Sequence, residues 1–269
     1  MKTILITGST DGIGKMAAFR FAEAGYEVIL HGRNPAKLAE TIKEIKTATG
    51  SKNIQGFVSD FSDLNSVHQM VDAIKQEVPN LDILINNAGI FKSNAPSTAD
   101  GFDIRFVVNY LAPFVLTKKL LSVLAKGKAP RIINLSSAAQ APVSLDALKG
   151  NVALSAQEAY AQSKLALTMW SFNLAHLRSD MVVIAVNPGS LLNTKMVKEA
   201  YGNHWSPAEK GSNILFDLAI SEEYENSSGR YFDNDKGTVK GFFAPAHPDT
   251  ENLSKIENLI STTEHILAK

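Results

Sequence analysis

Short apolar segments alternate with helical segments along the whole chain, and this alternation limits the folds open to it. Seven β-branched runs predict strands, at residues 3–6, 26–30, 54–58, 81–85, 131–135, 181–186 and 230–232. Most are apolar at successive positions, as in strands covered by helices on both faces. Between them, apolar residues recur with helical spacing. The order predicts an α/β fold with a doubly wound, mostly parallel sheet that binds ligands at the carboxyl ends of its strands.

The 269 residues show no internal repeat, low-complexity tract or linker, so we expect a single domain over residues 1–269. Two regions are less regular, residues 138–159 and residues 194–248. The second is too long for an ordinary connection. We expect it to form a substrate loop or lid, because such segments often build the walls of binding sites.

Composition excludes several classes of function. The chain has no cysteine, which rules out disulfides, thiol nucleophiles and cysteine-ligated metals. Its 27 basic and 27 acidic side chains balance, and its six histidines show no ligand spacing. We therefore expect no nucleic-acid partner and no metal site. The sequence shows neither a signal peptide nor an 18-residue apolar run, so we expect no membrane anchor and a cytoplasmic location.

A glycine-rich loop follows the first expected strand and reads TGSTDGIG, with a helix expected from Lys15. Glycines in this context let the backbone approach a pyrophosphate, whose charge is received by the N–H groups of the following helix. A plain tight turn is the alternative. The candidate cofactor-binding residues of the loop are Gly8, Ser9, Thr10, Asp11, Gly12, Ile13 and Gly14.

The end of the second strand indicates which nicotinamide cofactor is preferred. An acidic side chain at this place holds a ribose 2′-hydroxyl, whereas a cation accepts a 2′-phosphate. The chain has Arg33 and Asn34 there and no carboxylate. The planar guanidinium of Arg33 suits a phosphate, which favours NADP(H) over NAD(H). A solvated loop arginine is the alternative.

Tyr160 and Lys164 are four residues apart in a helical segment and therefore share one face. A nearby cation lowers the pKa of a phenol, which makes the tyrosine a usable general acid or base. Such a pair also arises by chance. Here, however, Ser136 and Ser137 end the fifth strand, where a doubly wound sheet binds its ligand.

Together these motifs resemble the classical short-chain dehydrogenase/reductase family, over nearly the whole chain. The matching residues are Gly8, Gly12 and Gly14, Asp60, the NNAG of residues 86–89, Asn109, Ser137, Tyr160, Lys164, Pro188 and Gly189. The resemblance implies a Rossmann-like three-layer sandwich with a seven-stranded sheet.

By similarity, four residues would form the catalytic set: Ser137, Tyr160, Lys164 and Asn109. Tyr160 would exchange a proton with the substrate oxygen, which Ser137 would steady. Lys164 would favour the phenolate and hold the nicotinamide ribose, and Asn109 would anchor a water. Beyond the glycine loop, the implied cofactor-binding residues are Arg33, Asn34, Asp60, Phe61, Asn87, Ala88, Gly89, Tyr160, Lys164, Pro188, Gly189 and Thr194.

Some of these members have structural alternatives. Asn109 could bridge backbone, Asp60 could be a turn residue, and Pro188 with Gly189 could simply end a strand. The choice between Ser136 and Ser137 also stays open.

The spacing departs from the common family pattern in two places. Ser137 precedes Tyr160 by 23 positions rather than about a dozen, which resembles the retinol dehydrogenase-like subgroup. Without an anchor, a retinoid substrate is not implied. The threonine that commonly meets the nicotinamide lies one residue later, at Thr194, so its role stays open.

These observations predict an NADP(H)-dependent oxidoreductase that interconverts an alcohol and a ketone or aldehyde, a carbonyl reductase in one direction. The alternatives are a silent NADP(H)-binding sensor or scaffold, and an epimerase or dehydratase on the same fold. Met196, Tyr201 and Trp205 suggest an apolar small-molecule substrate, although they could equally pack a lid. A homodimer or homotetramer is compatible with the pattern, which does not distinguish them.

Overall fold

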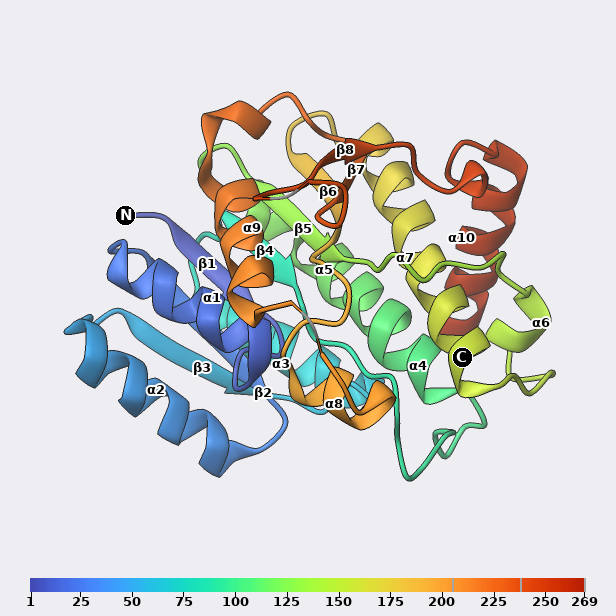
Figure 1. Cartoon of the computed structure of the whole chain (residues 1–269), viewed down its shortest axis with the longest axis horizontal. Coiled ribbons are helices and arrows are strands. Elements are labelled where there is room, and N and C mark those ends of the chain that lie inside the picture. Colours follow the sequence, from blue (N-terminus) through green and yellow to red (C-terminus); the bar gives the residue numbers. More distant parts are fainter. Residues whose placement is uncertain (205, 238, 269) are drawn as a thin grey trace.

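The computed structural model describes residues 1–204, 206–237 and 239–268. Its centre is one sheet in the order β3-β2-β1-β4-β5-β6-β7-β8 (Figure 1). The strands are β1 (Thr3–Ile6), β2 (Glu27–Gly32), β3 (Ile54–Val58), β4 (Ile83–Asn86), β5 (Arg131–Leu135), β6 (Val182–Asn187), β7 (Arg230–Asp233) and β8 (Phe242–Ala244). Neighbours from β3 to β7 pair in parallel, which confirms the expected doubly wound topology.

The expected number of seven strands is wrong by one, because β8 pairs antiparallel with β7 at the edge of the sheet. The pairing opposes Phe232 to Phe243 and Asp233 to Phe242. A three-residue strand is too short to show a periodic pattern. The sequence therefore could not predict β8 or its pairing with β7.

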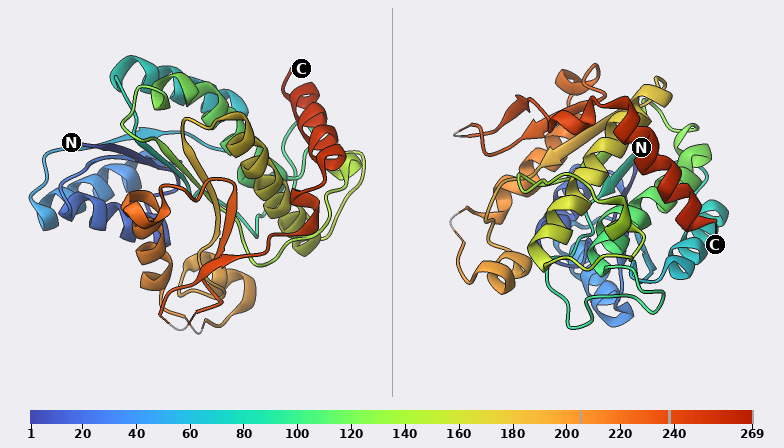
Figure 2. Two further views of the ribbon diagram at one scale, coloured as in Figure 1. Left: turned by 90° about the horizontal axis from the view of Figure 1, so that it is seen from above. Right: turned by 90° about the vertical axis from the view of Figure 1, so that its right-hand side faces the viewer.

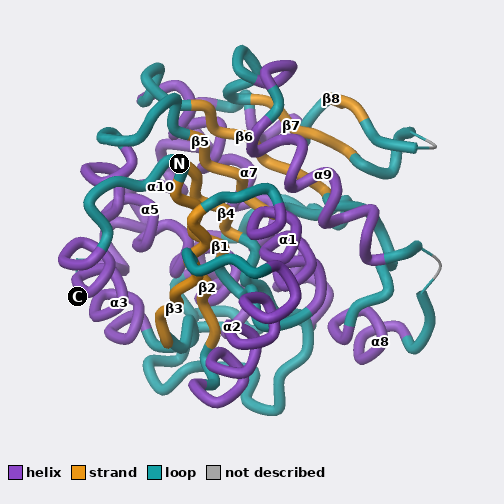
Figure 3. The backbone as a smooth tube through the Cα atoms, turned by 90° about the vertical axis from the view of Figure 1, so that its left-hand side faces the viewer, coloured by secondary structure: helices purple, strands orange, loops and turns teal. Residues whose placement is uncertain are grey.

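Helices cover both faces of the sheet, and the three layers are visible in Figures 2 and 3. One face carries α1 (Gly12–Glu23), α2 (Pro35–Thr49) and α9 (Ala208–Ile220), and the other carries α3 (Leu64–Glu77), α5 (Ala112–Leu124) and α7 (Ala156–Leu177). Helix α10 (Leu253–Leu267) packs outside α7. The shorter elements are α4 (Ile104–Phe106), η1 (Val107–Leu111), α6 (Leu145–Leu148), α8 (Lys195–Tyr201), η2 (Glu222–Tyr224) and η3 (Pro248–Thr250).

The two irregular regions are partly ordered into these elements. Residues 138–159 contain α6 and the start of α7, and residues 194–248 contain α8, α9, η2, β7 and β8. Helix α9 packs on α1. Helix α8 stands apart from the three layers (Figure 3).

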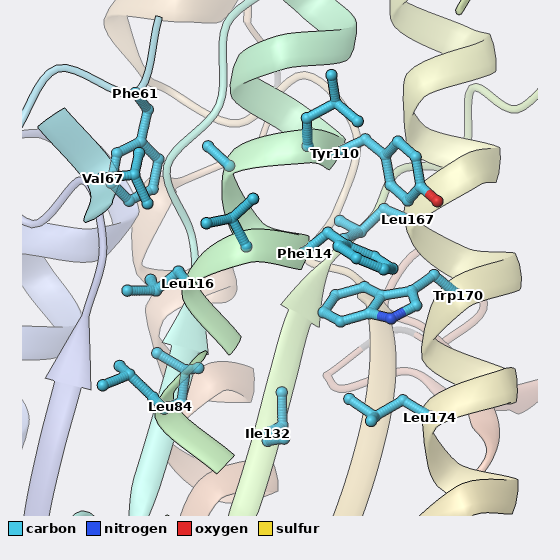
Figure 4. Close-up of a cluster of buried hydrophobic side chains, with 14 of the residues drawn as sticks. Phe61, Val67, Leu84, Tyr110, Phe114, Leu116, Ile132, Leu167, Trp170 and Leu174 are labelled. Carbon is cyan, nitrogen blue, oxygen red and sulfur yellow. The ribbon is translucent and has the colours of Figure 1, made fainter. Parts of the chain in front are cut away.

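The core between the sheet and α5 and α7 is aromatic and closely packed (Figure 4). Phe114 of α5 lies 5.2 Å from Trp170 of α7, ring centroid to ring centroid. Each buried large apolar side chain of this kind contributes about 1.5–3 kcal/mol. The packing fixes α7 against β6, and so fixes the position of the tyrosine and lysine that α7 carries.

One helix, Ile104–Leu124, is long and apolar enough to cross a membrane by length and composition. Of its most apolar 18-residue window, 72% is buried inside the protein. A core helix of a globular domain has this character. The cytoplasmic location stays a prediction.

Candidate active site

A cavity of about 370 Å³ lies where β4, β5 and β6 end, between the loops that follow them and α8. Its lining residues are Phe91, Ser137, Ala139, Tyr160, Asn187, Gly189, Ser190, Leu191, Met196, Val197 and Ala200. Two of the expected catalytic residues, Ser137 and Tyr160, therefore share one cavity. Met196 lines it as expected, whereas Trp205 and the side chain of Tyr201 lie outside the described residues.

The glycine loop joins β1 to α1, which begins at Gly12 rather than at the expected Lys15. The Asp11 carboxylate caps the helix by accepting a hydrogen bond from the N–H of Gly12 at 2.8 Å. Gly8 and Gly12 have φ angles of +64° and +50°, which favour glycine. A Cβ at Gly8 would lie 2.8 Å from the Cα of Ala88. The loop therefore needs its glycines.

The turn after β4 is bound to this loop through Thr7, a residue that the sequence analysis did not single out. The N–H groups of Asn87 and Ala88 both donate to the Thr7 hydroxyl at 3.0 Å. The Asn87 amide donates to the carbonyls of Thr7 (2.8 Å) and Gly8 (3.0 Å). A side chain at Gly14 would collide with this amide. The predicted loop and the predicted NNAG segment thus form one unit.

His31 supports the loop from β2, and it was also missed as a functional residue. Its Nδ1 accepts from the N–H of Gly8 at 3.0 Å, and its Nε2 lies 2.9 Å from the carbonyl of Ser59. Burial lowers the pKa of His31 to about 4, so the ring is neutral at pH 7. These partners assign the proton to Nε2. Its position in the largely apolar second strand was the sequence signal that could have identified it.

Two predicted cofactor-binding side chains are used inside the fold. The Ser9 hydroxyl accepts from the N–H of His31 at 2.9 Å, and Phe61 stacks on the His31 ring at 4.2 Å. Both side chains are buried. These side chains therefore support the loop and the neighbouring turn rather than face a ligand.

The residues predicted to bind the adenosine end of a cofactor lie at the surface beyond β2 and β3. Arg33 is exposed directly after β2. Asn34 caps α2 by accepting from the N–H of Lys37, and Asp60 accepts two hydrogen bonds from Ser62. An exposed guanidinium next to a glycine loop at the start of α1 fits a phosphate-bearing dinucleotide.

Lys164 is completely buried beneath the cavity. Its Nζ donates to the carbonyl of Leu135, the last residue of β5, at 2.7 Å and lies 5.7 Å from the centroid of the Tyr160 ring. Burial lowers the pKa of Lys164 to about 8, because the ammonium is removed from water. Gly89 of the loop after β4 lies close by, since a Cβ built on it would be in van der Waals contact with this Nζ, at 3.5 Å.

Tyr160 is half-buried and lies edge-on to Phe91, with ring centroids 5.0 Å apart. Ser155 and Glu158 form a capping box that starts α7, and Tyr160 and Lys164 lie about one turn apart in its N-terminal part.

The structure separates the two neighbouring serines. The Ser136 hydroxyl is buried against α7, where it lies 2.6 Å from the Thr168 hydroxyl and donates to the carbonyl of Lys164. Ser137 lines the cavity, and its hydroxyl accepts from the N–H of Ala139. The geometry favours Ser137 as the serine that meets a substrate.

Asn109 lies in the π-helical turn η1 and is fully buried. Its Oδ1 accepts from the N–H of Ile90 at 2.8 Å, and its Nδ2 donates to the Ile90 carbonyl and the Ser163 hydroxyl, both at 3.0 Å. The side chain therefore bridges the loop after β4 to α7. This is the backbone-bridging alternative for its amide, and both N–H groups of that amide are already used.

The segment after β6 closes the cavity on another side. Gly189 has a φ of +121°, and it lines the cavity together with Asn187 and Ser190. Pro188 lies between them and is half-buried. Thr194 caps α8 by accepting from the N–H of Val197, and its methyl group would lie 3.6 Å from a Cβ at Gly12. Thr194 is thus beside the glycine loop.

Polar residues in β7 and in the turn after it also reach the site and were not expected. Tyr231 donates to the carbonyl of Ser137 at 3.0 Å, and Asp235 binds Ser190. They follow from the same rule that located the serines, because β7 ends at the same edge of the sheet. The described residues contain no cluster of three or more histidines and acids that could hold a metal.

The family model and similar known proteins indicate the same family. A family model described as short chain dehydrogenase matches residues 2–204. The polyprenol dehydrogenase of Homo sapiens is 31% identical over 261 residues, which cover 88% of this chain and 78% of that protein. Retinol dehydrogenase 13 of Mus musculus is 34% identical over 252 residues, covering 86% of this chain and 75% of that protein.

Similarity extends to solved structures. A protein of Escherichia coli CFT073, solved in complex with NADPH, superposes with a TM-score of 0.72 at 28% identity. The match covers 86% of this chain and 95% of that one.

Proposed function

Because this chain belongs to the short chain dehydrogenase family, whose relatives are oxidoreductases, we propose that it interconverts an alcohol and a ketone or aldehyde with NADP(H). The observation that carries the proposal is the single cavity lined by Ser137 and Tyr160, with the buried Lys164 ammonium 5.7 Å from the tyrosine ring. A protein that only binds the nucleotide has a use for Lys164, which would hold the nicotinamide ribose, but it needs no serine and tyrosine facing a common cavity.

When bound, the nicotinamide supplies or accepts the hydride. The residues of this chain handle the proton. Tyr160 gives its phenolic proton to the carbonyl oxygen during reduction and removes it during oxidation, and Ser137 donates a hydrogen bond to the same oxygen. Lys164 stabilises the phenolate, because an ammonium near a phenol favours its charged form.

The cofactor fits the residues present. The glycines allow the tight turn before α1 to form without side-chain clashes, and Arg33 is exposed next to this turn. The residue after β2 is a cation rather than an acid, which supports NADP(H) over NAD(H). A relative that was solved with NADPH supports the same cofactor.

The cavity favours a neutral, apolar substrate. Ser137, Tyr160, Asn187 and Ser190 supply its polar side chains, and the other lining residues that the structure describes are apolar and uncharged. An ionised substrate would lose hydration in such a cavity without gaining a counter-charge. Two relatives are named for apolar alcohols, retinol and a polyprenol.

The test is Tyr160→Phe in a spectrophotometric assay of NADPH oxidation against a panel of apolar ketones and aldehydes. We expect kcat to fall by about 10²–10⁴, the usual contribution of a positioned general acid, with NADPH binding retained. Tyr26→Phe is the matched control, since Tyr26 packs against Phe21 in the core away from the cavity.

Two results would overturn the proposal. Tyr160→Phe could retain most of the carbonyl reduction, which would exclude the phenol as the proton donor. Alternatively, the unmodified protein could bind NADPH and reduce no member of the panel, which would favour the sensor.

A further inference from the structure

Three consecutive residues at the end of β7 bind the cavity wall that follows β6. Asp233 is the last residue of β7, and Asn234 and Asp235 begin the turn to β8, at the edge of the sheet (Figures 1 and 3). Together they hydrogen-bond to Asn187, Pro188 and Ser190 of the segment 187–190. We refer to these three residues as the β7 clasp.

The contacts of the clasp are specific. Asn187 donates through Nδ2 to Asp233 Oδ1 and Asp235 Oδ2, both at 2.8 Å. Asn234 donates to the carbonyl of Pro188 at 2.9 Å. The Ser190 N–H donates to Asp235 Oδ1 at 2.8 Å, and the Ser190 hydroxyl donates to Asp235 Oδ2 at 2.5 Å. The segment is held by its backbone as well as by its side chains.

The segment held in this way is strained. Leu191 has a φ of +46°, which is unfavourable for a bulky side chain. Leu191 lines the cavity together with Asn187, Gly189 and Ser190. A backbone in such a conformation persists only where neighbouring contacts fix it. The bonds from Asp235 to Ser190, the residue before Leu191, are positioned to do this.

The carboxylate of Asp235 is the member that can be removed without opening the core. Asp235 is exposed, whereas Asp233 and Asn234 are buried. Burial raises the pKa of Asp235, but hydrogen bonds from Ser190 and Asn187 and the nearby Lys210 lower it overall. Asp235 is therefore ionised at neutral pH and accepts charge-assisted hydrogen bonds.

We propose that Asp235 is a positioning residue that holds the segment 187–191 as a wall of the catalytic cavity. The inference rests on the proposed function, since it assigns Asp235 a part in forming that site. The clasp lies beyond residues 2–204, which the family model matches, so the contacts that fix this wall come from a part of the chain outside that match. Asp235 acts through Ser190 and Leu191.

The first test needs neither cofactor nor substrate. Amide hydrogen exchange should show that Asp235→Ala accelerates exchange at Ser190 at least about tenfold, because its N–H loses its only recorded acceptor in the described structure. Asp235→Asn keeps one acceptor oxygen and should restore part of the protection. The matched control is Asp180→Ala, which removes an exposed carboxylate that accepts two hydrogen bonds from Arg178 before β6 begins, at the opposite edge of the sheet.

The second test separates positioning from general damage. Asp235→Ala should lower kcat for carbonyl reduction about tenfold or more, with its thermal midpoint equal to that of Asp180→Ala and with Asp235→Asn intermediate in kcat. Unchanged exchange at Ser190 would overturn the clasp, as would faster exchange with an unchanged kcat. If the unmodified protein reduces no carbonyl while Asp235→Ala still exchanges faster at Ser190, the proposed function fails and the contact itself stands.

Discussion

Replacing Lys164 by methionine should change the pH dependence of stability in a way that only a buried ammonium can explain. The Lys164 side chain is completely buried, and burial lowers its pKa from 10.5 to about 8. Folding therefore disfavours the charged form of Lys164 by a few kcal/mol, since each pKa unit corresponds to about 1.4 kcal/mol. Methionine has a similar length and no charge, so the variant does not incur this cost.

The sign follows from proton binding. Between pH 8 and pH 10.5 the unfolded chain keeps the Lys164 proton and the folded chain has released it, so the stability of the unmodified protein rises with pH over this window. Lys164→Met lacks this rise. The stability of the variant relative to the unmodified protein should therefore be highest below pH 8 and fall by about 2 kcal/mol between pH 7 and pH 9.5.

The size of the difference at pH 7 depends on a second effect. The variant also loses the hydrogen bond from Nζ to the carbonyl of Leu135, and hydrogen bonds of charged groups contribute about 1.5–3 kcal/mol. This loss offsets much of the gain at any one pH. The informative quantity is therefore how the difference in unfolding free energy between the two proteins changes with pH. That change reports the shifted pKa of Lys164.

The assay is urea unfolding at half-unit intervals from pH 7 to pH 9.5, with both proteins free of cofactor. Lys46→Met is the control, since Lys46 is exposed on α2 and its ammonium keeps its hydration. Carbonyl reduction by Lys164→Met should be nearly lost in parallel. A stability difference that stays flat, or that rises with pH, would refute the desolvation of Lys164.

Two further predictions concern the cofactor site. In Gly14→Ala the new methyl group would collide with the Asn87 amide and the carbonyl of Gly8. This variant should bind NADPH more weakly in a fluorescence titration, and its unfolding free energy in urea should fall by about 1–3 kcal/mol. Unchanged binding and stability would contradict the close packing of the glycine loop against the turn after β4. Arg33→Ala should weaken NADPH binding at least tenfold and leave NADH binding nearly unchanged, as expected when one charge-assisted contact to the 2′-phosphate is lost. Equal weakening of both cofactors would remove the basis for the NADP(H) preference.

Local sequence signals were sufficient for most of the sheet. The bounds of β1, β3 and β5 agree with their apolar runs. For β1 and β5 the reason is that a strand buried on both faces needs consecutive apolar residues. Strand β8 was not expected, since its three residues carry no periodicity and its pairing depends on the turn after β7.

The site was only partly accessible in this way. Tyr160 and Lys164 could be paired from the sequence because helical spacing puts residues four apart on one face. The spacing could not show that the Asn109 amide is used to bridge Ile90 and Ser163, or that the Phe61 side chain stacks on His31. Those contacts depend on how separate elements pack.

The sequence by itself therefore determined the doubly wound order, the glycine loop and the tyrosine–lysine pair, because each arises from residues within a few positions of one another. The tertiary structure decided which of two adjacent serines faces the cavity, by burying Ser136 against Thr168. It also decided what holds that cavity in place. Tyr231 reaches Ser137 across 94 positions and Asp235 reaches Ser190 across 45, and contacts between residues so far apart along the chain exist only once the parallel strands bring their carboxyl ends together.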